Sequence, residues 1–439
     1  MTARFCAAFL KLETGARKPD IPPRCWQPAK NRLYHQVLAA TFTSSRIETR
    51  PNWAEVSLSA LRHNFRVLQD HVGADVTICA VVKCNAYGHG VEECALALEQ
   101  AGAKWFGVTS TDEGVLLREV GVKGRILVLC GLYAGEEEDA LRHQLTPAVF
   151  RLEDAQAVTR AATRLELTSK VPIHLKIDTG MARLGLPLAE LESFVEGVNR
   201  LPQIEVEGAF SHLASSEVLD DEGTRQQIER FETGLRILAA HGLHPPLRHL
   251  ANSAAVGARP DTWHNLVRPG VALYGYEQPT CYRDGSPAMD ILPLSLRRVL
   301  AWKTHVLGLR DVPAGQALGY GGVYVTSAPA RIAVVSVGYG DGLARKISLA
   351  SAGAPETATG RGQVLLRGQR APIVGRISMD LTLVDATRVT GAAIGDEVVL
   401  IGRSGLQEIT AWDHARWADT VVYETLCNLS KCVPRRHAW

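Results

Sequence analysis

From residue 51 onward, short apolar runs alternate with segments whose apolar residues recur every three or four positions. Runs of the first kind are typical of buried strands, and the second spacing is typical of amphipathic helices. After a strand at 53–58 and a helix at 59–72, eight further strands are predicted, at 77–83, 105–110, 125–130, 146–150, 171–178, 206–213, 247–253 and 267–274. Helices are predicted between them, at 91–101, 136–144, 154–165, 188–201 and 224–241. This alternation predicts an N-terminal (β/α)8 TIM-type barrel, although an open doubly wound sheet would show the same pattern.

The helical spacing ends near residue 289, and a second domain is predicted from there to residue 439. Its strands are short and separated by Gly and Pro, at 299–309, 331–337, 363–367, 373–374, 381–384 and 397–401. One helix, at 411–418, follows them. The expected organisation is therefore an α/β chain with a barrel at 51–288 and a mostly β domain at 289–439.

Charge and composition limit the possible partners. The chain has 439 residues, 46% hydrophobic and 21% charged, with a net charge of +2. Residues 1–50 carry nine Lys or Arg against three Asp or Glu, and the remainder carries 39 against 43. Residues 51–439 are therefore slightly acidic, which makes them a poor candidate for binding nucleic acid. No apolar run is long enough to span a membrane. We expect residues 1–50 to be a flexible extension or a start assigned too far upstream, rather than a targeting peptide.

The nine cysteines form no C-x-x-C pair, and several lie inside apolar runs as buried thiols do. This usage predicts a reducing, cytoplasmic setting.

Lys83 stands where an apolar run ends and a polar, glycine-containing turn begins, in the stretch AVVKCNAYGHG at 80–90. A strand buried on both faces gives an ammonium group no solvent, so a lysine forced there tends to become a nucleophile or a Schiff-base partner. A single lysine at such a boundary more often reaches solvent. The polar residues gathered in the following turn make the functional interpretation the better one.

Other polar residues follow predicted strands, where the working residues of a barrel lie. They are Lys176 with Arg183 seven residues on, His212, Ser253, and Arg268 with Gly270. Each has an ordinary explanation, since Lys176 could end a strand in solvent, His212 could be a core histidine and Ser253 could cap a helix. Their expected convergence with Lys83 on one barrel mouth favours a common site.

This set suits pyridoxal 5′-phosphate. The cofactor requires a Schiff-base lysine, backbone amides and small residues for its phosphate, and an arginine for its ring or for a carboxylate. Ser253 and Gly270 both offer exposed amides to an anion. No GxxxxGK[ST] loop is present, which argues against a nucleotide phosphate, and no metal site is predicted.

The β domain adds three glycine-rich loops. LGYGG at 318–322 contains Tyr320, VGYGDG at 337–342 contains Tyr339, and GRISMD at 375–380 contains Met379. In the first two loops, glycines on both sides of the tyrosine allow a sharp turn that directs the tyrosine ring outward. Each loop could equally be an ordinary turn at a sheet edge.

Taken with these loops, the chain resembles the bacterial alanine racemases, which are pyridoxal-phosphate enzymes of fold type III. The resemblance runs from about residue 50 to residue 434, and residues 80–90 match the family's cofactor-lysine signature almost letter for letter. It implies interconversion of L-alanine and D-alanine by two bases, in a homodimer whose active sites are shared between subunits. The product would serve peptidoglycan synthesis in the cytoplasm.

The resemblance also implies roles for individual residues. Lys83 would hold the cofactor and act as one catalytic base, and Tyr320 from the partner subunit would be the other. Arg183 and Met379 would hold the substrate carboxylate. Contacts to the phosphate would come from Tyr87, Ser253, Gly270, Val271 and Tyr339. Arg268 would face the pyridine nitrogen with His212 in the same network, and Lys176 matches a lysine that is carbamylated in some members and orients Arg183.

Alternative functions remain open on the same residues. A broad-specificity racemase or a basic-amino-acid decarboxylase would use the same scaffold, and a pyridoxal-phosphate carrier would use the barrel alone. A binding module would depend on the basic extension. Tyr320 and Arg183 argue against the decarboxylase, and the full second domain argues against the carrier.

Three features depart from the family pattern. The extension at 1–50 has no counterpart in it. Cys84 follows the cofactor lysine where many relatives carry alanine, and we expect little effect on the chemistry. The C-terminus ends VPRRHAW, where relatives commonly have a shorter tail, so the packing of the terminus cannot be carried over.

Overall fold

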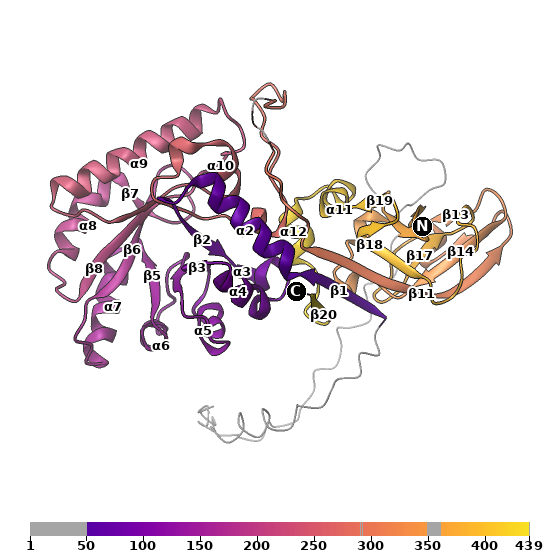
Figure 1. Cartoon of the computed structure of the whole chain (residues 1–439), viewed down its shortest axis with the longest axis horizontal. Helices are drawn as coiled ribbons and strands as arrows, with labels where there is room; N and C mark the ends of the chain where they lie inside the picture. Colours follow the sequence, from indigo (N-terminus) through magenta and orange to yellow (C-terminus); the bar gives the residue numbers. More distant parts are fainter. Residues whose placement is uncertain (1–50, 290, 292, 349–360, 439) are drawn as a thin grey trace, which may run out of the picture. The chain divides into compact units, whose positions relative to one another are not determined.

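Two sheets carry this structure, a computed structural model that describes residues 51–289, 291, 293–348 and 361–438 (Figure 1). The extension predicted at 1–50 lies outside the described residues. The first sheet has eight parallel strands in the order β10-β2-β3-β4-β5-β6-β8-β9, with the short strand β7 (Leu186–Pro187) beside β6. Their bounds are Thr77–Val81 (β2), Trp105–Val108 (β3), Arg125–Val128 (β4), Leu145–Val149 (β5), Val171–Asp178 (β6), Ile204–Phe210 (β8), Leu247–His249 (β9) and Leu266–Val267 (β10).

The eight strands form a nearly closed barrel, as predicted. Across the remaining gap, the Arg268 amide donates to the Ala251 carbonyl at 3.0 Å, and the Arg248 amide donates to Oδ1 of Asn265 at 2.8 Å. Strands such as β3 and β5 are buried along their whole length, which explains why they appear in the sequence as continuous apolar runs. The barrel, and not the open doubly wound sheet, is therefore the fold of this domain.

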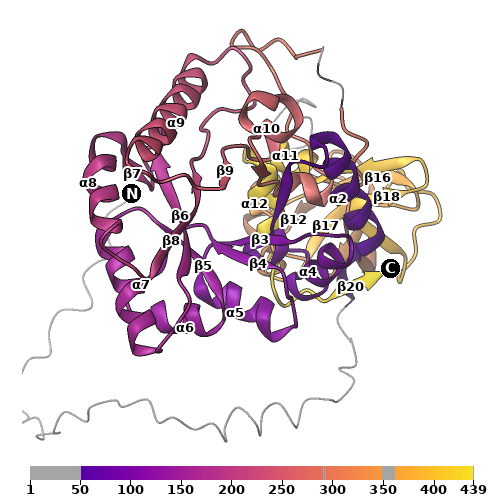
Figure 2. The same ribbon diagram turned by 60° about the vertical axis from the view of Figure 1, so that its left-hand side comes forward.

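Helices cover the outer side of the barrel strands (Figures 1 and 2). They are α2 (Leu58–Val72), α4 (Val91–Gln100), α5 (Thr111–Glu119), α6 (Glu137–Arg142), α7 (Leu152–Arg164), α8 (Leu191–Val198), α9 (Glu222–Ala240) and the short α10 (Ser253–Ala258). The longest, α9, begins where Asp221 accepts the amide of Thr224 at 2.7 Å. All the predicted helices are present, within a few residues of their predicted ends.

Several strand predictions differ from the structure. The strand expected at 247–253 ends at His249, and the one expected at 373–374 is only an isolated bridge between Ile373 and Val384. The strand expected at 267–274 ends at Val267, because Pro269 has no amide for the ladder, and residues 271–274 form the 3-10 helix η3 (Val271–Tyr274). The strand expected at 53–58, β1 (Asn52–Ser57), is present but pairs with strands of the other sheet. Residues 52–57, which the prediction placed with the barrel, are therefore part of the β-rich sheet.

The β-rich sheet is built around β11 (Leu300–Val312), whose 13 residues pair with β1, β14 and β18. The other strands are β14 (Ala330–Val335), β15 (Gln363–Leu366), β16 (Gln369–Pro372), β17 (Thr382–Asp385), β18 (Glu397–Ser404), β19 (Gln407–Ile409) and β20 (Arg435–Ala438). A separate hairpin joins β12 (Ala317–Leu318) to β13 (Tyr324–Val325). The C-terminal strand β20 runs parallel to β1, so residues 435–438 are held in this sheet.

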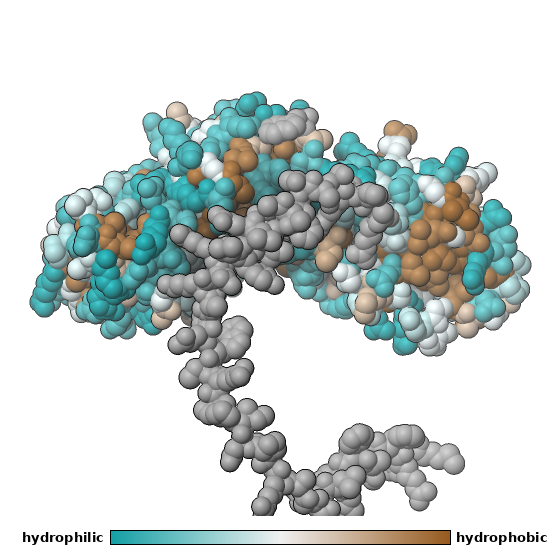
Figure 3. Space-filling view, turned by 90° about the horizontal axis from the view of Figure 1, so that it is seen from below, coloured by the Kyte–Doolittle hydropathy of each residue, from teal (hydrophilic) through white to brown (hydrophobic). Residues whose placement is uncertain are grey.

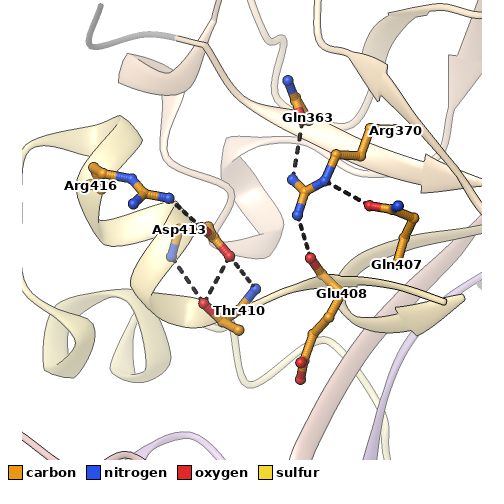
Figure 4. Close-up of polar contacts among 7 residues, drawn as sticks. All are labelled: Gln363, Arg370, Gln407, Glu408, Thr410, Asp413 and Arg416. Carbon is orange, nitrogen blue, oxygen red and sulfur yellow. Dashed lines mark hydrogen bonds and ion pairs between the residues drawn. The ribbon is translucent and has the colours of Figure 1, made fainter. Parts of the chain in front are cut away.

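Polar contacts fix the helix α11 (Ala411–Ala418), which has the predicted bounds (Figure 4). The Thr410 hydroxyl accepts the Asp413 amide at 3.2 Å, and the Asp413 carboxylate accepts the Thr410 amide at 2.8 Å. Beside it, Arg370 donates to Gln363, Gln407 and the Glu408 carbonyl, which ties β16 to β15 and β19. A second short helix, α12 (Val422–Cys427), follows and was missed in the sequence.

No helix in the part of the chain that the structure describes is long and apolar enough to cross a membrane.

Candidate active site

A cavity of 510 Å³ lies at the C-terminal ends of the barrel strands. It brings together eight of the residues that the sequence singled out: Lys83, Tyr87, Lys176, Arg183, His212, Ser253, Arg268 and Gly270. Hollows of 780 Å³ and 550 Å³ lie elsewhere, but neither is lined by a lysine or by any of these residues. The chemistry of the chain is therefore concentrated in the smaller cavity.

The turn that follows Lys83 is left-handed. Four consecutive residues, Cys84 to Tyr87, have φ between 51° and 55°, a conformation that costs about 1–2 kcal/mol for each residue with a side chain. A left-handed turn repeats after nearly four residues, as a right-handed one does. Lys83 and Tyr87 can therefore both line the cavity.

Hydrogen bonds from three directions hold this turn. The Cys84 amide donates to Oε1 of Glu113 at 2.6 Å, and Oδ1 of Asn85 accepts the Val91 amide at 2.9 Å. From the C-terminal strand, Nε of Arg435 donates to the Gly88 carbonyl at 2.9 Å. The strain is therefore balanced by contacts from outside the turn, as is common at functional sites.

The C-terminal tail, whose packing the sequence left open, thus supports the cofactor-lysine turn. Nε2 of His437 lies 3.0 Å from the His89 carbonyl, and Arg435 also donates to the carbonyls of Leu429, Ser430 and Val433. These contacts connect β20, the end of α12 and the turn after Lys83.

One end of the cavity offers a cradle for a phosphate. Oγ of Ser253 accepts the Gly270 amide at 2.8 Å, and a Cβ atom placed on Gly270 would lie 2.3 Å from Oη of Tyr87. A side chain at position 270 would therefore fill the space beside these donors. Burial raises the pKa of Tyr87, so its phenol stays a hydrogen-bond donor at neutral pH. Val271, the next residue, is buried at the start of η3.

A second tyrosine at this cavity, Tyr423, was not predicted from the sequence as a site residue. It comes from α12, and its ring centre lies 6.2 Å from that of Tyr87. Burial raises its pKa as well. No strand end or glycine-rich loop marked it, and the only signal in the sequence is an isolated tyrosine after two valines near the C-terminus.

Arg268 is buried behind the cavity, where it donates to Nδ1 of His249 at 2.8 Å and to the Ser211 carbonyl at 2.6 Å. Burial lowers its pKa to about 10, so it remains a cation at neutral pH. The sequence placed His212 in its hydrogen-bond network. In the described residues the bonded histidine is His249, and His212 only shares the cavity.

His249 continues the network through the barrel core. A guanidinium only donates, so Nδ1 of His249 accepts and its Nε2 carries the proton. That nitrogen lies 2.8 Å from Nδ1 of His174, and Nε2 of His174 lies 3.5 Å from the Glu207 carboxylate. Burial and the charge of Arg268 lower the pKa of His249 well below its usual value, so the ring stays neutral. The chain of contacts therefore fixes one tautomer for each histidine.

The surroundings of His212 and Lys176 disfavour their charged forms, so His212 is neutral at pH 7, whereas Lys176 stays mostly protonated. Burial, followed by the charge of Arg268, lowers the pKa of His212 to about 3. Burial lowers the pKa of Lys176 to about 8, and its Nζ lies 3.3 Å from the Leu129 carbonyl and 5.4 Å from the centre of the Phe210 ring. Arg183, at the edge of the cavity, is exposed.

The three residues predicted from the β domain are not at this cavity. Tyr320, Tyr339 and Met379 are 69%, 44% and 55% exposed. Their loops contact one another: the Gly340 amide donates to the Met379 carbonyl at 2.9 Å, and Nη1 of Arg376 lies 3.5 Å from the Tyr320 carbonyl. The chain therefore presents these residues together on a surface of the β domain.

Comparison with known proteins matches most of the chain. Family models described as the N-terminal and C-terminal domains of alanine racemase match residues 56–278 and 299–437. The alanine racemase of Symbiobacterium thermophilum is 42% identical over 387 residues, which are 88% of this chain and 97% of that relative.

Solved structures of alanine racemases have the same fold as this chain. The alanine racemase of the D-cycloserine producer Streptomyces lavendulae has a TM-score of 0.80 and 33% identity, and the match covers 89% of this chain and 97% of that one. The alanine racemase from Bartonella henselae with covalently bound pyridoxal phosphate has a TM-score of 0.76 and 29% identity, over 88% and 99% of the two chains.

Fold, cavity and matches together define an enzyme of the pyridoxal-phosphate class built on a barrel and a β domain. The residues present fit the cofactor, with a lysine at a strand end, a cradle at Ser253 and Gly270, and a buried cation behind the cavity. The chain belongs to the alanine racemase family.

Proposed function

We propose that this protein interconverts L-alanine and D-alanine with pyridoxal phosphate bound in the barrel cavity. The observation that carries the proposal is the meeting of Lys83 with the Tyr87–Ser253–Gly270 cradle in one cavity. Bound pyridoxal phosphate withdraws electrons from the α-carbon of an amino acid and so stabilises the charge left when a proton is removed.

Each end of the cavity has its own task in this proposal. Tyr87, Ser253, Gly270 and Val271 bind the phosphate, and Lys83 holds the cofactor covalently. Arg268 faces the pyridine nitrogen as a donor, and its bond to His249 keeps it oriented. Tyr339 was expected at the phosphate, but it is 44% exposed and does not line the cavity of its own chain, so in this proposal it reaches the cavity of another chain. Tyr423 is the tyrosine that lines the cavity of its own chain.

Inversion at the α-carbon needs a base on one face and an acid on the other. We assign Lys83 to the proton of the D isomer and Tyr320 to that of the L isomer. A tyrosine has an ordinary pKa of about 10, so nearby positive charge must help it accept a proton. Arg183 and Arg268 line the cavity and supply such charge.

The active form in this proposal is a homodimer with shared sites. Tyr320 is exposed on the β domain, so it reaches a cavity only if a second copy docks there. Further large apolar residues are exposed on the same loops and strands, namely Val325, Tyr339, Met379 and Leu381. Figure 3 shows apolar side chains gathered on the β-rich domain. An exposed apolar surface of this kind is typical of a protein interface.

Arg183 and the Met379 amide bind the substrate carboxylate in this scheme, and a carbamylated Lys176 orients Arg183. Carbamylation requires an unprotonated amine, and a pKa of about 8 leaves much more of Lys176 in that form than an ordinary lysine would have. A carbonyl signal in ¹³C NMR after exposure to labelled bicarbonate, lost in Lys176→Arg, would support this role. Its absence from the wild type would end it.

We place the protein in the cytoplasm, where it supplies D-alanine for peptidoglycan. The described cysteines support a reducing setting, since all seven are free thiols.

Exchange of the α-proton in D2O tests the function. We expect the holoenzyme to incorporate deuterium into both L-alanine and D-alanine with inversion. The Lys83→Ala variant should incorporate deuterium into neither enantiomer. Wild-type protein with bound cofactor that exchanges neither enantiomer would contradict the proposed activity.

A further inference from the structure

Two cysteines from different domains border the cofactor cavity. Cys84 directly follows Lys83, and Cys427 is the last residue of α12. Both are free and exposed, and both line the cavity. They are 343 residues apart in the sequence, so only the fold brings them together.

The two segments that carry these cysteines are packed firmly against each other. A Cβ atom on Gly88 would lie 2.2 Å from the Leu426 carbonyl oxygen, so the backbones touch. Arg435 bridges them, since it donates to the Gly88 carbonyl at 2.9 Å and to the Leu429 carbonyl at 2.8 Å. The contact between the two segments is therefore part of the fold and places both cysteines at the same cavity.

Burial, and then the neighbouring Cys84 side chain, raises the pKa of the Cys427 thiol. Both sulfurs also lie near the Tyr87 ring, whose ionisation they oppose. A third thiol at the cavity, Cys130, instead interacts with Lys176. Cys84 and Cys427 therefore form a pair, and Cys130 stands apart from it.

We propose that Cys84 and Cys427 are an oxidation site. A peroxide converts the two thiols into a disulfide beside the cofactor lysine, and this disulfide lowers the racemase activity reversibly. The loss of activity rests on the proposed racemase function, whereas the disulfide itself does not.

The chemistry proceeds in two balanced steps. Hydrogen peroxide transfers an oxygen to the Cys84 sulfur, so the O–O bond breaks, a sulfenic acid forms and water leaves. The Cys427 sulfur then attacks the Cys84 sulfur, the S–O bond breaks, and the hydroxide leaves as water with the proton of Cys427. The protein loses two hydrogen atoms and the peroxide becomes two waters.

The order of the steps follows from the environment of Cys427. Although this residue is exposed at the cavity, enough protein surrounds its sulfur that desolvation raises the pKa of the thiol to about 12. The thiolate is the form that reacts with peroxide, so Cys427 is a poor first site and serves as the resolving thiol.

The disulfide would affect the reaction through Lys83. In the proposed mechanism the Lys83 side chain changes position, because it both holds the cofactor and carries a proton. A bond from the next residue to α12, which also carries Tyr423, restricts that movement.

The test uses the full-length holoenzyme, treated with hydrogen peroxide and then with dithiothreitol. We expect a Cys84–Cys427 peptide with the mass of the two peptides less two hydrogen atoms, and a severalfold loss of racemase activity that the thiol reverses. Cys84→Ala and Cys427→Ala should each lose the cross-link and keep their own untreated activity under peroxide. Cys432→Ala, an exposed cysteine away from the cavity, should behave like the wild type.

Folded wild-type protein without the Cys84–Cys427 peptide would overturn the proposal. A cross-link without loss of activity would overturn its regulatory part, as would equal inactivation of Cys427→Ala. A protein that forms the cross-link but shows no racemase activity before oxidation would contradict the proposed function and leave the oxidation site standing.

Discussion

Arg268 donates a hydrogen bond to Nδ1 of His249 at 2.8 Å, and this contact sets the protonation of a histidine chain that runs through the barrel core. His249→Leu would leave a buried guanidinium with fewer partners. Because a hydrogen bond to a charged group contributes about 1.5–3 kcal/mol, we expect the free energy of unfolding to fall by about 2 kcal/mol. His249→Gln offers an acceptor and should recover part of this loss.

Urea unfolding measures the effect, and His244→Leu, an exposed histidine, is the control with an expected change within about 0.5 kcal/mol. Equal stabilities of His249→Leu and the wild type would show that Arg268 does not depend on this bond.

Buried histidines predict a loss of stability on mild acidification. Burial lowers the pKa of His89 and His414 to about 4 and that of His212 to about 3, below the ordinary 6.5. The unfolded chain therefore binds more protons, and the stability present above pH 6.5 is lost as the pH falls towards the folded values.

Each such histidine contributes up to about 1.4 kcal/mol per pH unit. His414→Gln, in α11 and distant from the cavity lining, should reduce the slope of stability against pH between 5 and 6 by about one proton. An unchanged slope would mean that His414 titrates normally in the folded protein.

Gly338 is required by the close approach of two β-domain loops. A Cβ atom on Gly338 would lie 2.1 Å from the Met379 carbonyl oxygen, so Gly338→Ala must displace the loop that carries Met379. We expect a loss of about 1–3 kcal/mol in stability and a rise in the KM for alanine. Gly308→Ala, where nothing lies within 4 Å, is the matched control. Similar behaviour of the two variants would remove Met379 from the substrate site.

Arg435 is predicted to support cofactor binding from outside the cavity. It bonds the Gly88 carbonyl and three carbonyls near the end of α12, so Arg435→Met should loosen the left-handed turn after Lys83. We expect cofactor affinity, measured by titration of the apoenzyme, to fall about tenfold, which corresponds to about 1.4 kcal/mol. Arg436 lies in the same strand as Arg435 and contacts the Trp53 ring of β1. Arg436→Met, which removes this contact, should leave the cofactor affinity unchanged.

The sequence predicted the features that depend on local pattern. The barrel strands are continuous apolar runs, and the polar residues at their ends converge because parallel strands place those ends together. Features that depend on contacts between residues far apart in the chain could not be predicted from that pattern. The pairing of β1 with β11, the left-handed turn held by Glu113 and Arg435, and the partnership of Arg268 with His249 rather than His212 all rest on residues far apart in the chain. Tyr423 was missed because α12 is a six-residue helix without a side-chain cap.

In the proposed dimer, an active site takes Lys83 from one chain and Tyr320 from another. Lys83→Ala and Tyr320→Phe should each be inactive as purified homodimers. Unfolding and refolding them together in equal amounts should restore about a quarter of the wild-type activity per site, because half of the dimers are mixed and each has one intact site. Activity that stays at the level of the separate variants, with mixed dimers present by mass, would contradict the claim.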